Sequence, residues 1–225
     1  MERKSLYRYS EKKWSNALIE RGSIRVGTLQ DFRKTEHKPG ISDPFEGTKR
    51  LLHEIDDWDL DDEVNGSPSY HAKATELMGM FSIGPNTGGI RFTGCSSERV
   101  VEVPNCFIYC TSHRLHKDVM SQFEGADSCV EIYRLQNFYE CLTAAINKRV
   151  PVRWGGLRDV RYASRTEICN GNDFGETPTW LKGEDFAGQY EARAVWHPMN
   201  PHEPLEPFAM EIPELSRFCR KIKAR

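Results

Sequence analysis

The stretch Phe186-Ala-Gly-Gln-Tyr-Glu-Ala-Arg-Ala-Val-Trp196 combines a strand pattern with a carboxylate in an apolar run. Successive side chains of an extended segment point to opposite faces, which predicts that Gln189, Glu191 and Arg193 share one face. The β-favouring residues that follow end at Pro198. Two interpretations are open. One is a charged outer face of a sheet, which is the commoner use of such a pattern, and the other is a carboxylate and an amide side by side at a cleft.

Chain length and net charge narrow the possible fold and the possible binding partners. The 225 residues are 38% hydrophobic and 28% charged, which predicts one globular domain over 1–225 with a core of its own. The formal net charge is −2, and this near-neutral balance excludes a global basic field of the kind that attracts nucleic acid. Binding of nucleic acid through a local basic patch stays open.

No targeting or membrane segment is evident. Residues 1–5 are charged and lead into no apolar signal core, and no apolar run approaches the roughly 20 residues of a membrane span. We therefore expect a cytoplasmic protein without a membrane partner. The seven cysteines are an odd number without a Cys-x-x-Cys pair, which favours reduced thiols over disulfides or a zinc site.

The rest of the pattern consists of many short strands and a few helices. A strand at 6–9 is followed by a helix at about 11–21, which we expect Ser10 to cap and Gly22 to end. The strand at 106–112 is strongly apolar and is expected in the centre of the sheet. The predicted fold class is therefore α+β and mostly antiparallel. Further strands are predicted at 23–28, 50–55, 100–103, 130–133, 159–163 and 207–212, and further helices at 136–148 and 214–223.

An acidic run at 54–63 holds seven acids in ten residues, a pattern typical of a solvated loop. A surface that docks a basic partner is the alternative, whereas the register fits no calcium-binding loop. Residues 64–99 are rich in Gly, Ser and Asn, with only short apolar clusters. We interpret the segment at about 54–99 as an insertion into the single domain.

Three polar positions lie in strand contexts. Arg8 is on the first strand, Thr111 and Ser112 end the strongly apolar strand, and Gln189-x-Glu191 lies in the stretch 186–196, near the last strand. A buried strand that ends in hydroxyls brings them to the edge of a sheet, where a ligand can reach them. In this order the residues resemble the signature of ADP-ribosyltransferases of the arginine-serine-glutamate type.

Further residues carry the same resemblance. The opening Leu6-Tyr-Arg-Tyr9, the helix to Gly22 and the strand Ser23-Ile-Arg-Val26 resemble the start of this fold in bacterial toxin members. A second resemblance, over about 6–196, is to a poorly characterised bacterial family with Ser42-Asp-Pro-Phe45, a Cys-x-Ser-like strand and Tyr190-Glu-Ala-Arg193. The chain departs from the transferase signature in having Cys-Thr-Ser-His at 110–113 in place of Ser-Thr-Ser, and in the length between Arg8 and Thr111.

The resemblance implies a split β-sandwich with peripheral helices and an NAD-binding cleft. Glu191 would stabilise the positive charge that develops when the nicotinamide–ribose bond breaks, as carboxylates do in glycoside hydrolysis. Arg8 would bind the pyrophosphate, which suits a planar bidentate cation. Ser112, or Thr111, would orient Glu191 and the ribose next to nicotinamide, and Gln189 would contact the acceptor.

Two kinds of side chain complete the implied site. Tyr7, Tyr9 or Tyr109 would stack on nicotinamide or adenine, with a role as core aromatics as the alternative. Arg193 is interpreted as a partner that positions Glu191. The implied catalytic set is thus Glu191, Gln189 and Ser112, the implied cofactor-binding set is Arg8, Tyr7, Tyr9, Thr111 and Ser112, and no metal is expected.

The leading function is therefore an NAD-consuming transferase that modifies a macromolecule, in a toxin or phage-defence effector with a neutralising antitoxin as a partner. Nucleic acid is slightly favoured over protein as the acceptor, because a basic cluster could follow a phosphate backbone. The first alternative is a catalytically inactive scaffold of the same fold that docks a basic partner through 54–63. The second is a metal-dependent nuclease built from Asp43, Glu46 or the acidic run. The basic cluster comprises Lys148, Arg149, Arg153, Arg158, Arg161 and Arg165.

Overall fold

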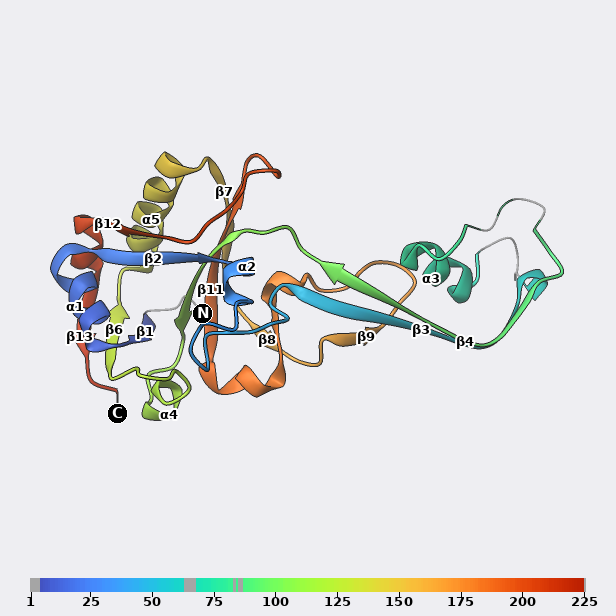
Figure 1. The fold of residues 1–225 in the computed structure, drawn as a ribbon, viewed down its shortest axis with the longest axis horizontal. Helices are drawn as coiled ribbons and strands as arrows, with labels where there is room; N and C mark the ends of the chain where they lie inside the picture. The colour runs from blue at the N-terminus through green and yellow to red at the C-terminus, as the bar shows by residue number, and fades with distance from the viewer. Residues whose placement is uncertain (1–4, 63–67, 83, 85–86, 225) are drawn as a thin grey trace. The chain divides into compact units, whose positions relative to one another are not determined.

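The computed structural model describes residues 5–62, 68–82, 84 and 87–224. The chain forms two compact units (Figure 1), the first made of Met1–Glu46, Pro104–Tyr162 and Lys182–Arg225, and the second of Gly47–Val103 and Ala163–Leu181. Helices and mainly antiparallel sheets are present, which confirms the predicted α+β class. The segment predicted as an insertion, about 54–99, falls within the second unit.

An eight-stranded sheet forms the first unit, and its strand pairs are antiparallel. Neighbouring strands such as β2 and β12 can be followed in Figure 1. The strands are β1 (Leu6–Ser10), β2 (Ser23–Thr28), β5 (Phe107–Ser112), β6 (Ser128–Ile132), β7 (Val152–Asp159), β11 (Glu191–Pro198), β12 (Phe208–Glu211) and β13 (Cys219–Ile222).

The central strand of this sheet is β5, as its apolar sequence predicted. One edge of β5 pairs with β11 along its whole length, from Phe107 to Ser112. The other edge is shared, because β1 pairs with it at Ser112 and β2 pairs with it at Phe107 and Ile108. The two strands therefore diverge from one edge of β5, and the sheet splits between them.

Helices pack on the strands through a common core. The longest helix is α5 (Leu135–Arg149), and it buries Phe138, Leu142 and Ile146 against Tyr109 and Trp196, as its amphipathic pattern predicted. The other helical segments of this unit are α1 (Lys12–Arg21), α2 (Leu29–Phe32), α4 (Lys117–Met120), η4 (Glu184–Gln189) and η5 (Pro213–Phe218).

Two local predictions in this unit are wrong. The cap of α1 is Glu11 without a side-chain bond, and the Ser10 hydroxyl instead lies 2.9 Å from that of Ser15. The segment predicted as a closing helix at 214–223 is a 3-10 turn followed by β13, which pairs with β6. Pairing along the edge of β6 satisfies the backbone groups of this segment, so tertiary context overrides a helical pattern.

The second unit is built on a long hairpin, β3 (Thr48–Asp59) with β4 (Arg91–Glu102), and β9 (Thr166–Ile168) runs parallel to β3. The loop predicted at 54–63 is wrong for 54–59, because these residues continue β3. Ile55 and Trp58 are buried while Glu54, Asp56 and Asp57 are exposed, so these acids are solvent-exposed residues of a strand and not of a loop.

The remaining elements are short. They are η1 (Leu60–Asp62), α3 (Tyr70–Met78) and η3 (Pro178–Trp180), with the paired strands β8 (Arg161–Tyr162) and β10 (Leu181–Lys182). The strand predicted at 100–103 is the end of β4. Residues 63–67, 83 and 85–86 of the predicted insertion lie outside the described residues.

Candidate functional site

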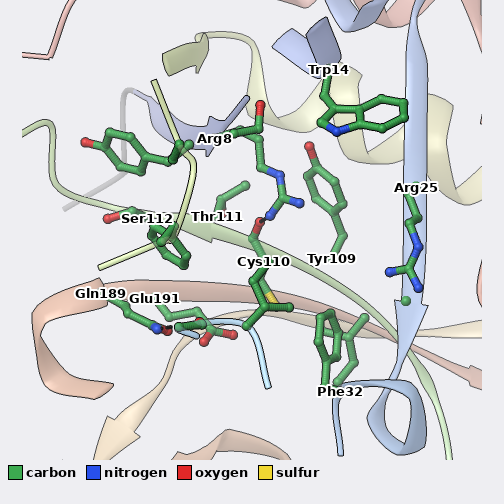
Figure 2. Close-up of a pocket in the computed structure, with 18 of the residues that line it drawn as sticks. Arg8, Trp14, Arg25, Phe32, Tyr109, Cys110, Thr111, Ser112, Gln189 and Glu191 are labelled. Atoms are coloured by element: carbon green, nitrogen blue, oxygen red, sulfur yellow. Dashed lines mark hydrogen bonds between the residues drawn. The ribbon is translucent and has the colours of Figure 1, made fainter. Parts of the chain in front are cut away.

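A cavity of about 430 Å³ lies in the first unit where the sheet splits, with walls from β1, β2 and β5. Figure 2 shows some of the side chains that line it. All residues of the implied catalytic and cofactor-binding sets line this cavity, namely Tyr7, Arg8, Tyr9, Thr111, Ser112, Gln189 and Glu191. The split therefore brings together residues that are far apart in the chain.

Arg8 lies at the mouth of the split. Its Nη1 donates a 2.8 Å hydrogen bond to the carbonyl oxygen of Cys110, on the stretch of β5 between its contacts with β1 and β2. Its guanidinium carbon is 5.3 Å from the centre of the Tyr109 ring. Within the described part of the chain no carboxylate pairs with Arg8. This guanidinium is thus fixed in place and has N–H donors left for an anion.

The two hydroxyls that end β5 hold the backbone on both sides of Glu191. Ser112 Oγ lies 3.3 Å from the Tyr190 carbonyl oxygen, and Thr111 Oγ1 donates a 2.9 Å bond to that of Ala192. Glu191 lies directly opposite Ser112 in the strand register. These contacts fix the backbone of β11 on both sides of Glu191 and so set where its side chain enters the cavity wall.

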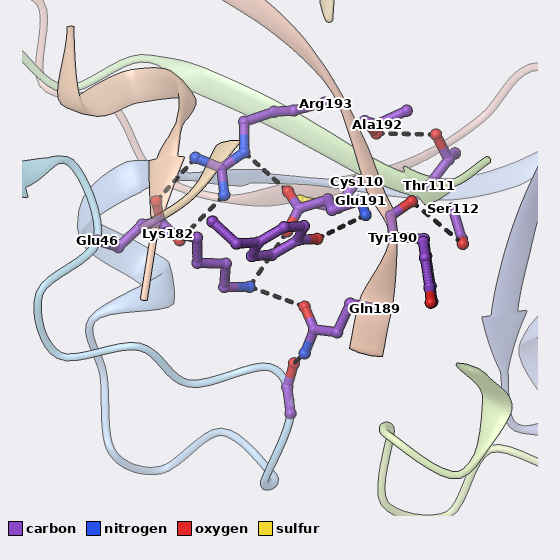
Figure 3. Close-up of polar contacts among 12 residues, drawn as sticks. Glu46, Cys110, Thr111, Ser112, Lys182, Gln189, Tyr190, Glu191, Ala192 and Arg193 are labelled. Atoms are coloured by element: carbon purple, nitrogen blue, oxygen red, sulfur yellow. Dashed lines mark hydrogen bonds and ion pairs between the residues drawn. The ribbon is translucent and has the colours of Figure 1, made fainter. Parts of the chain in front are cut away.

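Glu191 belongs to a buried chain of charges, which Figure 3 shows. Its Oε1 accepts a 2.8 Å bond from Arg193 Nε, and the other side of the same guanidinium binds both oxygens of Glu46, at 2.7 and 3.1 Å. Glu191 is 4% exposed and Arg193 is 1% exposed. The bidentate pair with Glu46 is the geometry in which arginine and carboxylate interact most strongly.

Lys182 closes the chain of charges on the other side. Its Nζ donates to Glu191 Oε2 at 3.1 Å and to Gln189 Oε1 at 2.9 Å, over the ring of Phe186. The amide of Gln189 in turn donates a 2.7 Å bond to the carbonyl oxygen of Gly40. Gly40 has a φ of +85°, and a Cβ there would lie 1.9 Å from a backbone oxygen, so this carbonyl position depends on glycine.

The charged states follow from these contacts. Burial acts to raise the pKa of Glu191, but Arg193 and Lys182 outweigh it and hold that pKa well below its usual range. Burial acts to lower the pKa of Lys182, yet Glu191 and Glu46 raise it, and the pKa of Arg193 is raised in the same way. Glu191 therefore stays ionised at neutral pH beside the charged Lys182 and Arg193.

The structure corrects the interpretation of 189–193 as one exposed strand face. Glu191 and Arg193 do share a face, but that face is buried, and β11 begins only at Glu191. Gln189 ends the 3-10 segment η4, and Tyr190 after it has a φ of 48°, a left-handed conformation uncommon for a side chain of this size. Gln189 and Glu191 meet through Lys182 instead of through strand alternation. Backbone strain of this kind is concentrated at functional sites.

Three residues contribute to the site in ways that the sequence did not predict. Glu46 directly follows the Ser42-Asp-Pro-Phe45 motif, and its pair with Arg193 joins this motif to Tyr190-Glu-Ala-Arg193. Lys182 had no sequence signal. The Tyr162 hydroxyl accepts a 2.6 Å bond from the backbone N–H of Glu191, and only its place in a predicted strand was visible.

The tyrosines of β1 are engaged in protein contacts. The Tyr9 hydroxyl donates to the carbonyl oxygen of Arg114 and accepts from the N–H of His116, and its ring stacks on Phe123. Burial raises the pKa of Tyr9 to about 12. Tyr7 lies opposite Ser112, with a half-buried ring beside the cavity. Tyr9 is thus the less available of the two for stacking on a ligand.

The described residues contain no group of three or more His, Cys, Asp or Glu side chains placed to hold a metal ion. Glu46, which the nuclease alternative would use, is occupied by Arg193. All seven cysteines are free thiols. No helix in the part of the chain that the structure describes is long and apolar enough to cross a membrane.

No family model, curated protein or solved structure matches this chain. The two resemblances therefore depend on the quoted residues and on their positions in the fold.

Proposed function

We propose that the protein is an NAD-dependent ADP-ribosyltransferase that modifies a macromolecule. The observation that carries this proposal is the position of Arg8, Ser112 and Glu191, in that chain order, around one cavity at the split of a β-sheet. The volume of about 430 Å³ lies in the range of small-molecule sites. A split β-sandwich of the transferase type accommodates this strand arrangement.

The residues fit the cosubstrate. Arg8 is a fixed guanidinium without a carboxylate partner among the described residues, which suits a diphosphate. Glu191 is an ionised carboxylate in the same cavity. When bound, NAD supplies an ADP-ribosyl group: its bond from nicotinamide nitrogen to ribose C1′ breaks, the electron pair leaves with nicotinamide, and an acceptor nucleophile bonds to C1′ and loses a proton to water.

The protein side chains would act by position and charge. Glu191 stabilises positive charge that develops on the ribose, and it needs no proton removed at neutral pH because its pKa is already low. Arg193 holds Oε1 of this carboxylate and Lys182 holds Oε2, so both are positioning residues. Gln189, held by Lys182 and Gly40, faces the same cavity and would contact the acceptor.

Nucleic acid is the acceptor we favour. Arg153 and Arg158 are exposed on β7, which pairs with β11 and so lies beside the strand that carries Glu191. Arg161 follows on β8 and is also exposed. Such residues follow a phosphate backbone through charge and not through base sequence. A toxin or phage-defence effector with an antitoxin partner fits an enzyme that modifies nucleic acid.

The test uses NAD labelled in its adenine, incubated with RNA, DNA or protein, together with a measurement of released nicotinamide. Wild type should release nicotinamide and label nucleic acid. Glu191→Gln should lower the rate about 10²- to 10³-fold, the usual scale for removing one group that stabilises transition-state charge. Glu184→Gln, at an exposed acid of η4, is the matched control and should leave the rate unchanged.

Because Glu191 is part of a buried ion network, Arg8→Ala provides a second variant outside that network. It should raise the KM for NAD more than it lowers kcat, since its role is to hold the diphosphate. Wild-type protein that is folded and yet releases no nicotinamide with any acceptor would overturn the proposal.

One observation favours the inactive scaffold as a second candidate. Both oxygens of Glu191 are held by cations, a satisfied arrangement that a purely structural network would also show. In this case the exposed acids of β3 would dock a basic partner. Replacing Glu54 and Asp56 by alanine should then weaken binding of a basic peptide and leave any nicotinamide release unaltered. Equal peptide binding by wild type and this double variant would contradict the scaffold function.

A further inference from the structure

We propose that Arg25 and Trp14 form the subsite for the nucleoside-diphosphate half of the cosubstrate, with the diphosphate between Arg25 and Arg8 and the base on the Trp14 ring. This rests on the proposed function, because it divides one dinucleotide cavity into two ends. Both residues line the cavity, and they come from β2 and α1, on the side of the split away from β11. Neither carries a role in the resemblance.

Arg25 is held ready for an anion. Its Nη2 donates a 2.6 Å bond to Oδ2 of Asp31, a carboxylate that is only 3% exposed. Thr28 fixes Asp31 by accepting its backbone N–H at 3.1 Å. Asp31 thus orients the guanidinium of Arg25, while the remaining donors of its planar fork stay on a side chain that lines the cavity.

Of the described lysine and arginine side chains that line the cavity, all but one form an ion pair with a carboxylate. Lys38 pairs with Glu11, Lys182 with Glu191 and Arg193 with Glu46, and Arg25 has Asp31. Among the described lining residues, Arg8 is the lysine or arginine without a carboxylate partner. An anion that bridges Arg8 and Arg25 would meet one unpaired and one anchored guanidinium, and a diphosphate has the oxygens to bind both.

Trp14 supplies the flat surface. It is 57% exposed although it lines the cavity, and Lys13 Nζ lies 5.1 Å from the centre of its ring. An exposed aromatic ring in a cavity wall is a stacking platform for a base. In Figure 2 Trp14 and Arg25 are drawn on one side of Arg8, and Gln189 and Glu191 on the other. The base and the reacting ribose would therefore lie at opposite ends, with the diphosphate at Arg8 between them.

Titration calorimetry of the full chain with ADP, adenosine and inorganic pyrophosphate tests this assignment. Arg25→Met should raise the Kd for ADP and pyrophosphate about tenfold and leave that for adenosine unchanged, as loss of a charge-assisted bond to phosphate requires. Trp14→Ala should raise the Kd for ADP and adenosine about tenfold and leave that for pyrophosphate unchanged. Arg21→Ala, at an exposed arginine of α1 that pairs with Glu211, is the control and should change none of them.

Absence of ADP binding to wild type, or equal weakening of all three ligands by either variant, would overturn the subsite. The outcome is separable from that of the proposed function. ADP binding with the expected pattern, without any nicotinamide release, would support the subsite and reject the transfer reaction. Nicotinamide release with the same KM for NAD in wild type and Arg25→Met would support the transfer and reject the subsite.

Discussion

Each of the two units buries a lysine against a glutamate, and the two sites differ in what surrounds the pair. In the first unit Lys182 and Glu191 are 5% and 4% exposed and belong to a chain of two acids and two bases. In the second unit the side chain of Lys49 is fully buried, but Glu167, 2.8 Å away, is 24% exposed. Glu167 is therefore the better solvated of the two carboxylates, and water compensates more for a lost partner there than at Glu191.

This difference indicates where a charge network has a use beyond folding. Burying four charges costs desolvation energy that a well-packed apolar cluster of the same size would avoid. The network in the first unit lines the cavity and holds Glu191 ionised, whereas Lys49 and Glu167 do not line that cavity. The desolvation energy of the buried charges is thus incurred where they line the cavity.

The largest effect is expected at Arg193, which bridges two acids. Arg193→Leu would leave Glu46 without its bidentate partner and Glu191 with Lys182 as its remaining cation, and both carboxylates are nearly fully buried. We expect a loss of about 5 kcal/mol in the free energy of unfolding, the upper part of the range for breaking a buried pair. Urea unfolding followed by circular dichroism measures it, and a loss below about 1 kcal/mol would show that the network does not support the fold.

The two lysines give the matched comparison. Lys182→Met should cost about 3 kcal/mol, because Glu191 loses one of its two cations and is only 4% exposed. Lys49→Met should cost about 1 kcal/mol, because Glu167 is partly solvated. The same urea titration measures both variants. Equal costs, or a larger cost at Lys49, would contradict the distinction drawn between the two units.

The contribution of Glu191 and Lys182 to the unfolding free energy depends on pH. The folded pKa of Glu191 is held below its ordinary value of 4.5, so its stabilisation is complete above that value and is lost as pH falls toward the folded pKa. The pKa of Lys182 is raised above 10.5, so its contribution is complete below that value and is lost only as pH rises through the folded pKa.

The difference in unfolding free energy between wild type and Glu191→Gln should therefore be constant from about pH 6 to pH 9 and shrink below about pH 4. Urea titrations of the two proteins over this range provide the measurement. A difference that grows on acidification would mean that Glu191 is protonated in the folded protein at neutral pH.

The smallest effect is expected at Tyr190. Its φ of 48° favours glycine, so Tyr190→Gly should be more stable than Tyr190→Ala by about 1 kcal/mol, although both lose the ring. Thermal unfolding of the pair measures the difference without the ring contacts affecting it. An alanine variant as stable as the glycine variant would show that no backbone strain is stored beside Glu191.

Much of the first unit could be predicted from local pattern. The central position of β5 followed from its apolar run, and the shared face of Glu191 and Arg193 followed from strand alternation. Alternation does not tell which face is covered, so the burial of Glu191 could not be predicted. The start of β11 directly after Tyr190 could not be predicted either, because left-handed residues other than glycine or asparagine have no reliable local signal.

The missing part of the site is non-local. Glu46 and Lys182 reach Glu191 and Arg193 from separate loops, and no spacing in the chain encodes these contacts. Edge pairing misled the prediction in a similar way, since both the acidic segment of β3 and the segment that forms β13 became strands through partners distant in sequence. Their side-chain patterns alone favoured a loop and a helix.

We propose that Glu191, held ionised at the split of the sheet, acts on the ribose of NAD. The most direct test is the rate of nicotinamide release by wild type and Glu191→Gln, measured at a temperature where unfolding curves show both proteins folded. We predict release by wild type and a rate about 10²- to 10³-fold lower in the variant. Equal rates in the two folded proteins, or no release by either, would rule out this role of Glu191.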